Sequence, residues 1–90
     1  MTRVKAVIYA TGWCPYCERA RQLLEQKGVA FEEIDVDARP GARQEMMSRS
    51  GRGTVPQIFI GERHLGGYTE LYLLDSRGGL GPLLSGASVN

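Results

Sequence analysis

The sequence predicts an α/β fold in which a four-stranded mixed β-sheet is flanked by helices. Short β-forming runs alternate with segments of helical periodicity, and glycine or proline residues separate them. The last two β-forming runs are close enough in sequence to form a hairpin, whereas the first two are joined by a helix and make a right-handed parallel unit. The predicted order of elements is therefore β-α-β-α-β-β-α.

The first half of the chain begins with a strand over residues 4–10, which is rich in β-forming residues. A helix over residues 14–27 follows, because Pro15 suits the first turn of a helix and Gly28 suits the position after its end. Its apolar residues recur every three or four positions, so one side of the helix faces the core. A second strand is expected at residues 30–36.

The second half of the chain supplies the remaining elements. We expect a helix at 40–50, strands at 57–60 and around 64–65, a helix at 68–77 and a helical turn at 80–84. Met46 and Met47 are expected to face inward from the first of these helices. Leu71, Tyr72 and Leu74 are expected to face inward from the second.

The chain of 90 residues is expected to form one domain, residues 1–90, with a flexible tail at 85–90. It has no room for a separate cofactor-binding domain, so we expect no permanently bound cofactor. The net charge of +1 and the scattered basic residues argue against nucleic-acid binding. The first apolar run is too short to span a membrane and has no secretory cleavage pattern, so we expect no membrane association and a cytoplasmic location.

Cys14 and Cys17 are the only cysteines. A reducing compartment disfavours a structural disulfide, and a bridge across so short a loop removes little entropy from the unfolded chain. At the start of a helix, free backbone N–H groups and the positive end of the helix dipole lower a thiol pKa from about 8.5 to roughly 3.5–7.5. Cys14 is therefore the predicted nucleophile, and Cys17, one turn inside the helix, the resolving thiol.

The cysteine pair is also compatible with functions other than thiol–disulfide exchange. A structural zinc site needs four ligands, and the chain offers only Cys14, Cys17 and His64. An iron–sulfur cluster shared between two chains is a better competitor, although Pro15 and the intramolecular partner Cys17 argue against it. A protein–protein adaptor, and a thioredoxin-like protein reduced directly by a flavoprotein, are the remaining alternatives.

The segment Thr54-Val55-Pro56 is a second candidate for function. If the bond before Pro56 is cis, the backbone of Val55 is turned outward, and an extended peptide can dock there beside Cys14. The alternative is an ordinary proline at the start of an edge strand. The position alone favours neither.

Gly66 and Gly67 form a third candidate segment. Two glycines let the backbone approach a ligand closely, and a helix that begins just after them presents N–H groups suited to a carboxylate. In the alternative interpretation Thr69 is a plain helix cap, and Glu70 only complements the dipole in the first turn.

Together these segments make the chain resemble the glutaredoxins, and in particular their bacterial dithiol type with a Cys-Pro-Tyr-Cys motif. The resemblance covers residues 4–84 and rests on Cys14-Pro15-Tyr16-Cys17, on the run Thr-Val-Pro-Gln-Ile-Phe-Ile at 54–60 and on Gly66-Gly67. It implies a thioredoxin fold, a glutathione site, and a role in electron transport and cell redox homeostasis.

The resemblance also assigns residues to roles. It implies that Cys14 is the nucleophile and Cys17 the resolving thiol. The glutathione-binding residues that it implies are Tyr16, Arg43, Thr54, Val55, Pro56, Gly67, Tyr68 and Thr69. Val55 is expected to pair through its backbone with the central cysteine of the tripeptide, next to a cis proline, and Arg43 to reach the glycine carboxylate.

The implied activity is glutathione-dependent reduction of protein–glutathione mixed disulfides and of protein disulfides, with glutathione as a co-substrate. The implied partners are glutathionylated or disulfide-containing proteins. Glutathione reductase acts only indirectly, through oxidised glutathione. The protein is expected to be a monomer.

Two positions depart from the family pattern. Thr11 stands where the family usually has a lysine that lowers the nucleophile's pKa, and Thr69 stands where it usually has an aspartate. Each missing charged contact costs on the order of 1–3 kcal/mol if desolvated, and less at an exposed rim. We therefore expect a working but weaker glutathione site. Trp13, more usual in thioredoxins, is expected to cover the thiol or to influence partner choice.

Overall fold

A computed structural model describes residues 5–85 of the chain. Its elements are β1 (Ala6–Ala10), α1 (Pro15–Gln26), β2 (Phe31–Asp35), α2 (Ala42–Ser50), β3 (Gln57–Ile60), β4 (Arg63–Gly66), α3 (Tyr68–Ser76) and α4 (Leu80–Ser85). This is the predicted order, with the expected last helical turn present as the short helix α4. The tail expected at 85–90 lies, apart from the final residue of α4, outside the described residues.

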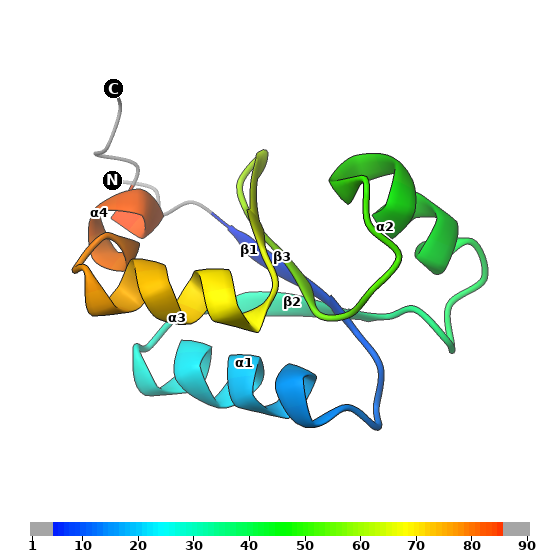
Figure 1. Cartoon of the computed structure of the whole chain (residues 1–90), viewed down its shortest axis with the longest axis horizontal. Helices are drawn as coiled ribbons and strands as arrows, with labels where there is room; N and C mark the ends of the chain where they lie inside the picture. Colours follow the sequence, from blue (N-terminus) through cyan, green and yellow to red (C-terminus); the bar gives the residue numbers. More distant parts are fainter. Residues whose placement is uncertain (1–4, 86–90) are drawn as a thin grey trace.

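The four strands form one mixed sheet in the order β2-β1-β3-β4 (Figure 1). Strand β1 is parallel to β2 and antiparallel to β3, and β3 is antiparallel to β4. The parallel unit and the hairpin are both as predicted. The hairpin joins the sheet beside β1, so β1 is a central strand.

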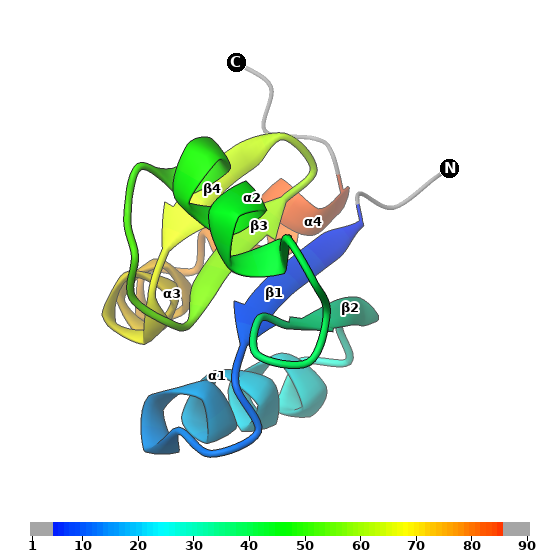
Figure 2. The same ribbon diagram turned by 90° about the vertical axis from the view of Figure 1, so that its right-hand side faces the viewer.

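Helices cover both faces of the sheet, with α1 and α3 on one face and α2 on the other (Figures 1 and 2). The side chains of β1 alternate between these layers, as the geometry of a strand requires. Ile8 is buried in the core cluster beneath α1, α3 and α4, whereas Tyr9 is buried in the cluster beneath α2.

Helix α1 packs against the sheet through residues spaced by three and four positions. Cys17, Ala20 and Leu24 are all fully buried, which is the pattern of a helix with one apolar face. Of the helices within residues 5–85, α1 is the longest at 12 residues. None of the helices in that range is long and apolar enough to cross a membrane.

Two of the expected inward side chains are exposed, which corrects the sequence interpretation. Met47 is 49% exposed and Tyr72 is 53% exposed. Consecutive residues of a helix point about 100° apart, so only one of two adjacent positions faces the sheet. Met46 takes that position in α2 and Leu71 takes it in α3, and each is fully buried.

Candidate active site

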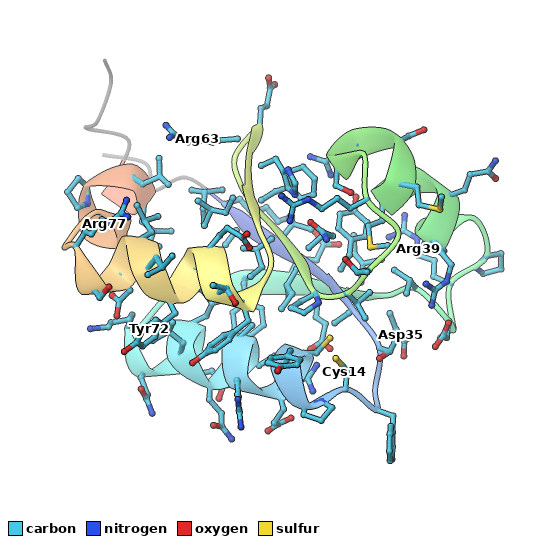
Figure 3. The ribbon with its side chains drawn as sticks, viewed as in Figure 1. Cys14, Asp35, Arg39, Arg63, Tyr72 and Arg77 are labelled. Carbon is cyan, nitrogen blue, oxygen red and sulfur yellow. The ribbon has the colours of Figure 1, made fainter. Side chains whose placement is uncertain are left out.

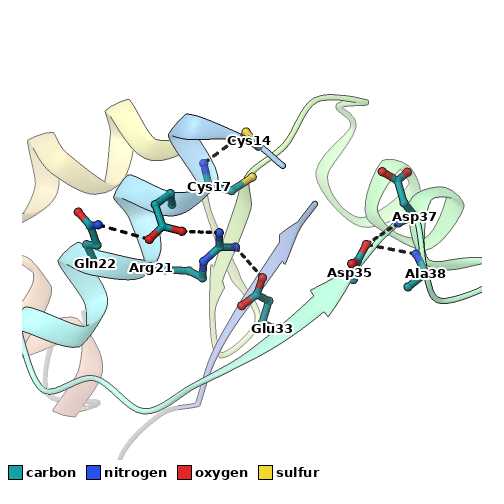
Figure 4. Close-up of polar contacts among 9 residues, drawn as sticks. Cys14, Cys17, Arg21, Gln22, Glu33, Asp35, Asp37 and Ala38 are labelled. Carbon is teal, nitrogen blue, oxygen red and sulfur yellow. Dashed lines mark hydrogen bonds and ion pairs between the residues drawn. The ribbon is translucent and has the colours of Figure 1, made fainter. Parts of the chain in front are cut away.

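Cys14 lies at the N-cap of α1, just after the end of β1 (Figure 4). Its backbone is extended, with φ −152° and ψ 117°, and Pro15 is the first helical residue. The Cys14 sulfur accepts a hydrogen bond from the backbone N–H of Cys17 at 3.3 Å, which is the position where an N-cap side chain meets the free N–H groups of a helix. Both cysteines are free thiols.

The two thiols differ in how readily they lose a proton. Burial opposes ionisation of Cys14, but hydrogen bonds from the Cys17 thiol and from the backbone N–H groups of Cys17 and Tyr16 outweigh it, so the pKa of Cys14 is lowered. Burial is also the largest influence on the pKa of Cys17. Together with the neighbouring Cys14, it raises this pKa to about 11. Cys14 is therefore the first of the pair to ionise.

Arg21 adds a positive charge that the sequence interpretation missed. Its guanidinium donates to Glu18 at 2.8 Å and to Glu33 of β2 at 2.6 Å, and the side chain is only 17% exposed (Figure 4). The charge of Arg21 acts to lower the pKa of both cysteines. A local signal was available, because Arg21 follows Cys17 by four residues and thus lies on the same helix face.

A recess of about 260 Å³ adjoins the nucleophile. It is lined by Gly12, Trp13, Cys14, Pro15, Glu18 and Arg21. Trp13 is 89% exposed, so its ring stands out in solvent and is not packed over the thiol.

A groove of about 230 Å³ begins at Tyr16, two residues after Cys14. It is lined by Tyr16, Arg52, Thr54, Val55, Pro56, Gln57, Gly67, Tyr68, Thr69 and Glu70. We call it the Val55 groove. It brings together every residue predicted to bind glutathione except Arg43. The bond between Val55 and Pro56 is cis, which is the isomer on which the docking interpretation depends.

Arg43 lies elsewhere. It pairs with Asp37 at 2.8 Å and lines a separate hollow of about 700 Å³ beside the start of α2. Figure 3 shows Arg39, which lines the same hollow, well apart from Cys14.

The cation that lines the Val55 groove is instead Arg52, whose guanidinium is 3.8 Å from the Glu70 carboxylate. Arg52 was not predicted, although it precedes Thr54 by only two residues.

The two glycines make close contacts within the chain itself. Gly66 has φ +122°, and a Cβ on it would lie 2.8 Å from the Glu70 carboxylate. Gly67 is the N-cap of α3, and its backbone N–H donates to Glu70 at 2.7 Å. That hydrogen bond is the main reason why the pKa of Glu70 is lowered. Glu70 therefore caps the start of α3, a role that the alternative interpretation gave to Thr69, and both residues line the groove.

The contacts of His64 are with residues other than the cysteines. Its Nε2 lies 2.7 Å from the side-chain oxygen of Gln57, and its ring is tilted against Phe59 with centroids 4.9 Å apart. Among residues 5–85 there is no group of three or more His, Cys, Asp or Glu side chains placed to hold a metal ion. The three candidate zinc ligands of the sequence are thus not gathered in the described part of the chain.

Comparison with known proteins agrees with this geometry. The glutaredoxin family model matches residues 6–65. Glutaredoxin 3 of Escherichia coli strain K12 is 57% identical over 77 residues, which cover 86% of this chain and 93% of that protein. The solution structure of a glutaredoxin from Brucella melitensis has a TM-score of 0.85 at 48% identity, and the match covers 100% of this chain and 98% of that one.

A crystal structure of a buckwheat glutaredoxin–glutathione complex is also similar, with a TM-score of 0.84 at 28% identity over 91% of this chain and 77% of that one. The mixed sheet and its helices are therefore a thioredoxin fold, as the resemblance implied. The chain is an enzyme of the glutaredoxin family, whose members are glutathione-dependent thiol–disulfide oxidoreductases.

Proposed function

We propose that this protein reduces mixed disulfides between proteins and glutathione, and disulfides within proteins, with glutathione as the reductant. The observation that carries the proposal is the Cys14 thiol at the start of α1, with its lowered pKa, two residues before Tyr16, which lines the Val55 groove. Membership of the family and the similarity to a glutathione complex support it.

On a mixed disulfide, the Cys14 thiolate attacks the glutathione sulfur. The bond between that sulfur and the protein breaks, and the protein thiolate leaves and takes up a proton. A second glutathione, as its thiolate, then attacks the glutathione sulfur of the Cys14–glutathione disulfide, and the bond from that sulfur to Cys14 breaks. This releases oxidised glutathione and the Cys14 thiolate, which is a good leaving group because its pKa is lowered.

On a protein disulfide, Cys14 opens the bond and Cys17 closes the cycle. The first attack leaves Cys14 bound to one protein sulfur. Cys17 then loses its proton to the departing protein thiolate and attacks the Cys14 sulfur, and two glutathione molecules later reduce the Cys14–Cys17 disulfide. The raised pKa of Cys17 suits this order, because Cys17 stays protonated until a basic thiolate is released beside it.

The Val55 groove is the proposed site for the glutathione part of the substrate. Within residues 5–85 neither backbone group of Val55 forms a hydrogen bond, so both are free to pair with an extended tripeptide. The rings of Tyr16 and Tyr68, with centroids 6.3 Å apart, form one wall. Thr69 lies towards the γ-glutamyl end, and Arg52 offers a cation to a carboxylate of the tripeptide.

The proposed partners follow from this cycle. They are glutathione and the glutathionylated or disulfide-containing proteins of the cytoplasm, and a separate reductase recycles oxidised glutathione. We propose that the protein works as a monomer without a permanently bound cofactor.

A coupled assay with glutathione, glutathione reductase and NADPH tests the proposal on a glutathionylated peptide. Cys14→Ser is expected to abolish turnover, and Cys17→Ser to keep substantial turnover, because only the protein-disulfide cycle needs both thiols. Equal loss in both variants would contradict the assigned roles. If the wild type is inactive with glutathione but is reduced efficiently by thioredoxin reductase, the glutathione dependence is wrong.

A further inference from the structure

Gln57 is a polar side chain in the interior of the protein. Only 1% of it is exposed, and a buried amide is costly unless its hydrogen bonds are made. Gln57 makes them on both sides. Its Nε2 donates to the carbonyl oxygen of Thr54 at 3.0 Å and to the Thr54 hydroxyl at 3.2 Å, and its Oε1 lies 2.7 Å from His64 Nε2.

These contacts fix the proton on His64. The NH₂ group of Gln57 is turned towards two oxygen atoms of Thr54, so the oxygen of the amide faces the histidine. His64 Nε2 must then be the donor, whether the ring is neutral or protonated. Contact of the His64 ring with Phe59 holds the ring in place.

The contact with Thr54 sets the direction of the next amide. Thr54 is exposed at the groove, whereas Gln57 is buried beneath it. The carbonyl of Thr54 and the N–H of Val55 belong to one planar peptide unit, and in a trans unit they point in opposite directions. Because Gln57 holds the carbonyl from the interior, the Val55 N–H points away from the interior and is presented at the Val55 groove.

We propose that Gln57, supported by His64, is a positioning residue for glutathione, because it fixes the peptide unit that presents the Val55 N–H to the tripeptide. The inference rests on the proposed glutathione site and deepens it. Gln57 itself does not act on the reacting sulfur atoms. Its loss is therefore expected to weaken docking of the glutathione part and to leave thiol chemistry at Cys14 unchanged.

Three variants separate the parts of this arrangement. Gln57→Met removes both sets of contacts with little change in side-chain volume. Gln57→Glu keeps an acceptor for His64 but places oxygen against the Thr54 carbonyl. Ile58→Val is the matched control, because Ile58 is a fully buried neighbour in β3 that contributes no side-chain hydrogen bond.

The main measurement is of KM and kcat separately, with a glutathionylated peptide as the substrate. In both Gln57 variants KM is expected to rise about three- to tenfold, the equivalent of one lost hydrogen bond, with kcat within about twofold of the wild type. The rate of Cys14 alkylation by iodoacetamide should stay at the wild-type value. An unchanged KM in both Gln57 variants, or an equal rise in Ile58→Val, overturns the inference.

A second readout does not depend on glutathione. In the free protein the amide resonance of Val55 is expected to move in both Gln57 variants, because the carbonyl of its peptide unit loses its partner, and to stay in place in Ile58→Val. An unmoved Val55 resonance in the Gln57 variants overturns the inference even if the wild type is active. A wild type inactive with glutathione instead defeats the proposed function, while the Val55 resonance still tests the position of the peptide unit.

Discussion

Cys14 and Arg21 come from the first two turns of one helix, and the charge of the second acts on the thiol of the first. The family's usual lysine is absent at Thr11, so activation of the nucleophile depends more on the helix terminus. Arg21 contributes as well. It is held by two carboxylates, which fix its place and offset part of its charge.

Arg21→Met is expected to raise the pKa of Cys14, and Arg21→Lys to preserve most of the lowering. A lowered pKa keeps the thiolate populated as pH falls below the ordinary thiol range, so alkylation of wild-type Cys14 persists to lower pH than that of a free cysteine. The pH profile of iodoacetamide alkylation, followed in Cys17→Ser, should move to higher pH in Arg21→Met.

Arg19→Met is the control for this shift. It removes the same charge from the same helix, at a side chain that lies over the ring of Tyr16. A shift of equal size in Arg19→Met, or a profile of Arg21→Met that superimposes on the wild type, contradicts a specific role for Arg21.

Among individual residues, the sequence predicted the roles of those whose chemistry depends on their spacing along the chain. Cys14 and Cys17 follow from three-residue spacing at a helix start. The partnership of Arg21 with Glu33, and that of Gln57 with His64, join different elements, and no local pattern encodes them. The pairing of Arg43 with Asp37 beside α2, outside the lining of the Val55 groove, is likewise not encoded by a local pattern.

The junction between β4 and α3 depends on its glycines. Gly66→Ala would place a Cβ at φ +122° and 2.8 Å from the carboxylate that caps α3. Strained backbone and a displaced cap together are expected to lower the free energy of unfolding by about 1–3 kcal/mol. Urea denaturation measures this loss.

Gly81→Ala is expected to raise the free energy of unfolding or to leave it unchanged. Gly81 lies in α4, and a Cβ on it would have no atom within 4 Å. Alanine is the better helix former by up to about 1 kcal/mol. If both substitutions lowered stability equally, the crowding at Gly66 would not be the cause.

Among the elements, the sequence predicted α1 well because proline and glycine mark its two ends. The nine-residue helices α2 and α3 are too short for periodicity to separate adjacent positions. This is why Met47 and Tyr72 were expected inside and lie outside.

At the scale of the whole molecule, residues 5–85 form a single sheet with one apolar cluster on each face. So small a chain has few buried side chains to lose. Leu71→Ala, at a fully buried position in the cluster beneath α1 and α3, is expected to cost about 2–5 kcal/mol of unfolding free energy. Thermal or urea denaturation gives the value.

Tyr72→Ala, at the adjacent and exposed position of the same helix, is the comparison. Its ring contacts only the neighbouring Tyr68 among the described aromatic rings, so a loss below about 1 kcal/mol is expected. Similar losses in the two variants would show that α3 packs on the sheet with a different face.

The layered architecture was predictable because the order of strands and helices leaves few ways to bury every apolar face. The position of the β3–β4 hairpin in the sheet was not predictable. Whether it joins β1 or β2 depends on which edge of the parallel pair remains open, and the sequence pattern of the strands is the same in either case.

The hydrogen bond from the Cys17 N–H to the Cys14 sulfur has a further consequence, for the direction of electron flow. It stabilises a thiolate, which exists only in the reduced protein, and so does the charge of Arg21. Whatever favours the reduced form makes the disulfide form a stronger oxidant. The features that let Cys14 attack a disulfide thus also make the Cys14–Cys17 disulfide easier to reduce. They therefore determine how strongly reducing the surroundings must be for the dithiol to be regenerated after each turnover.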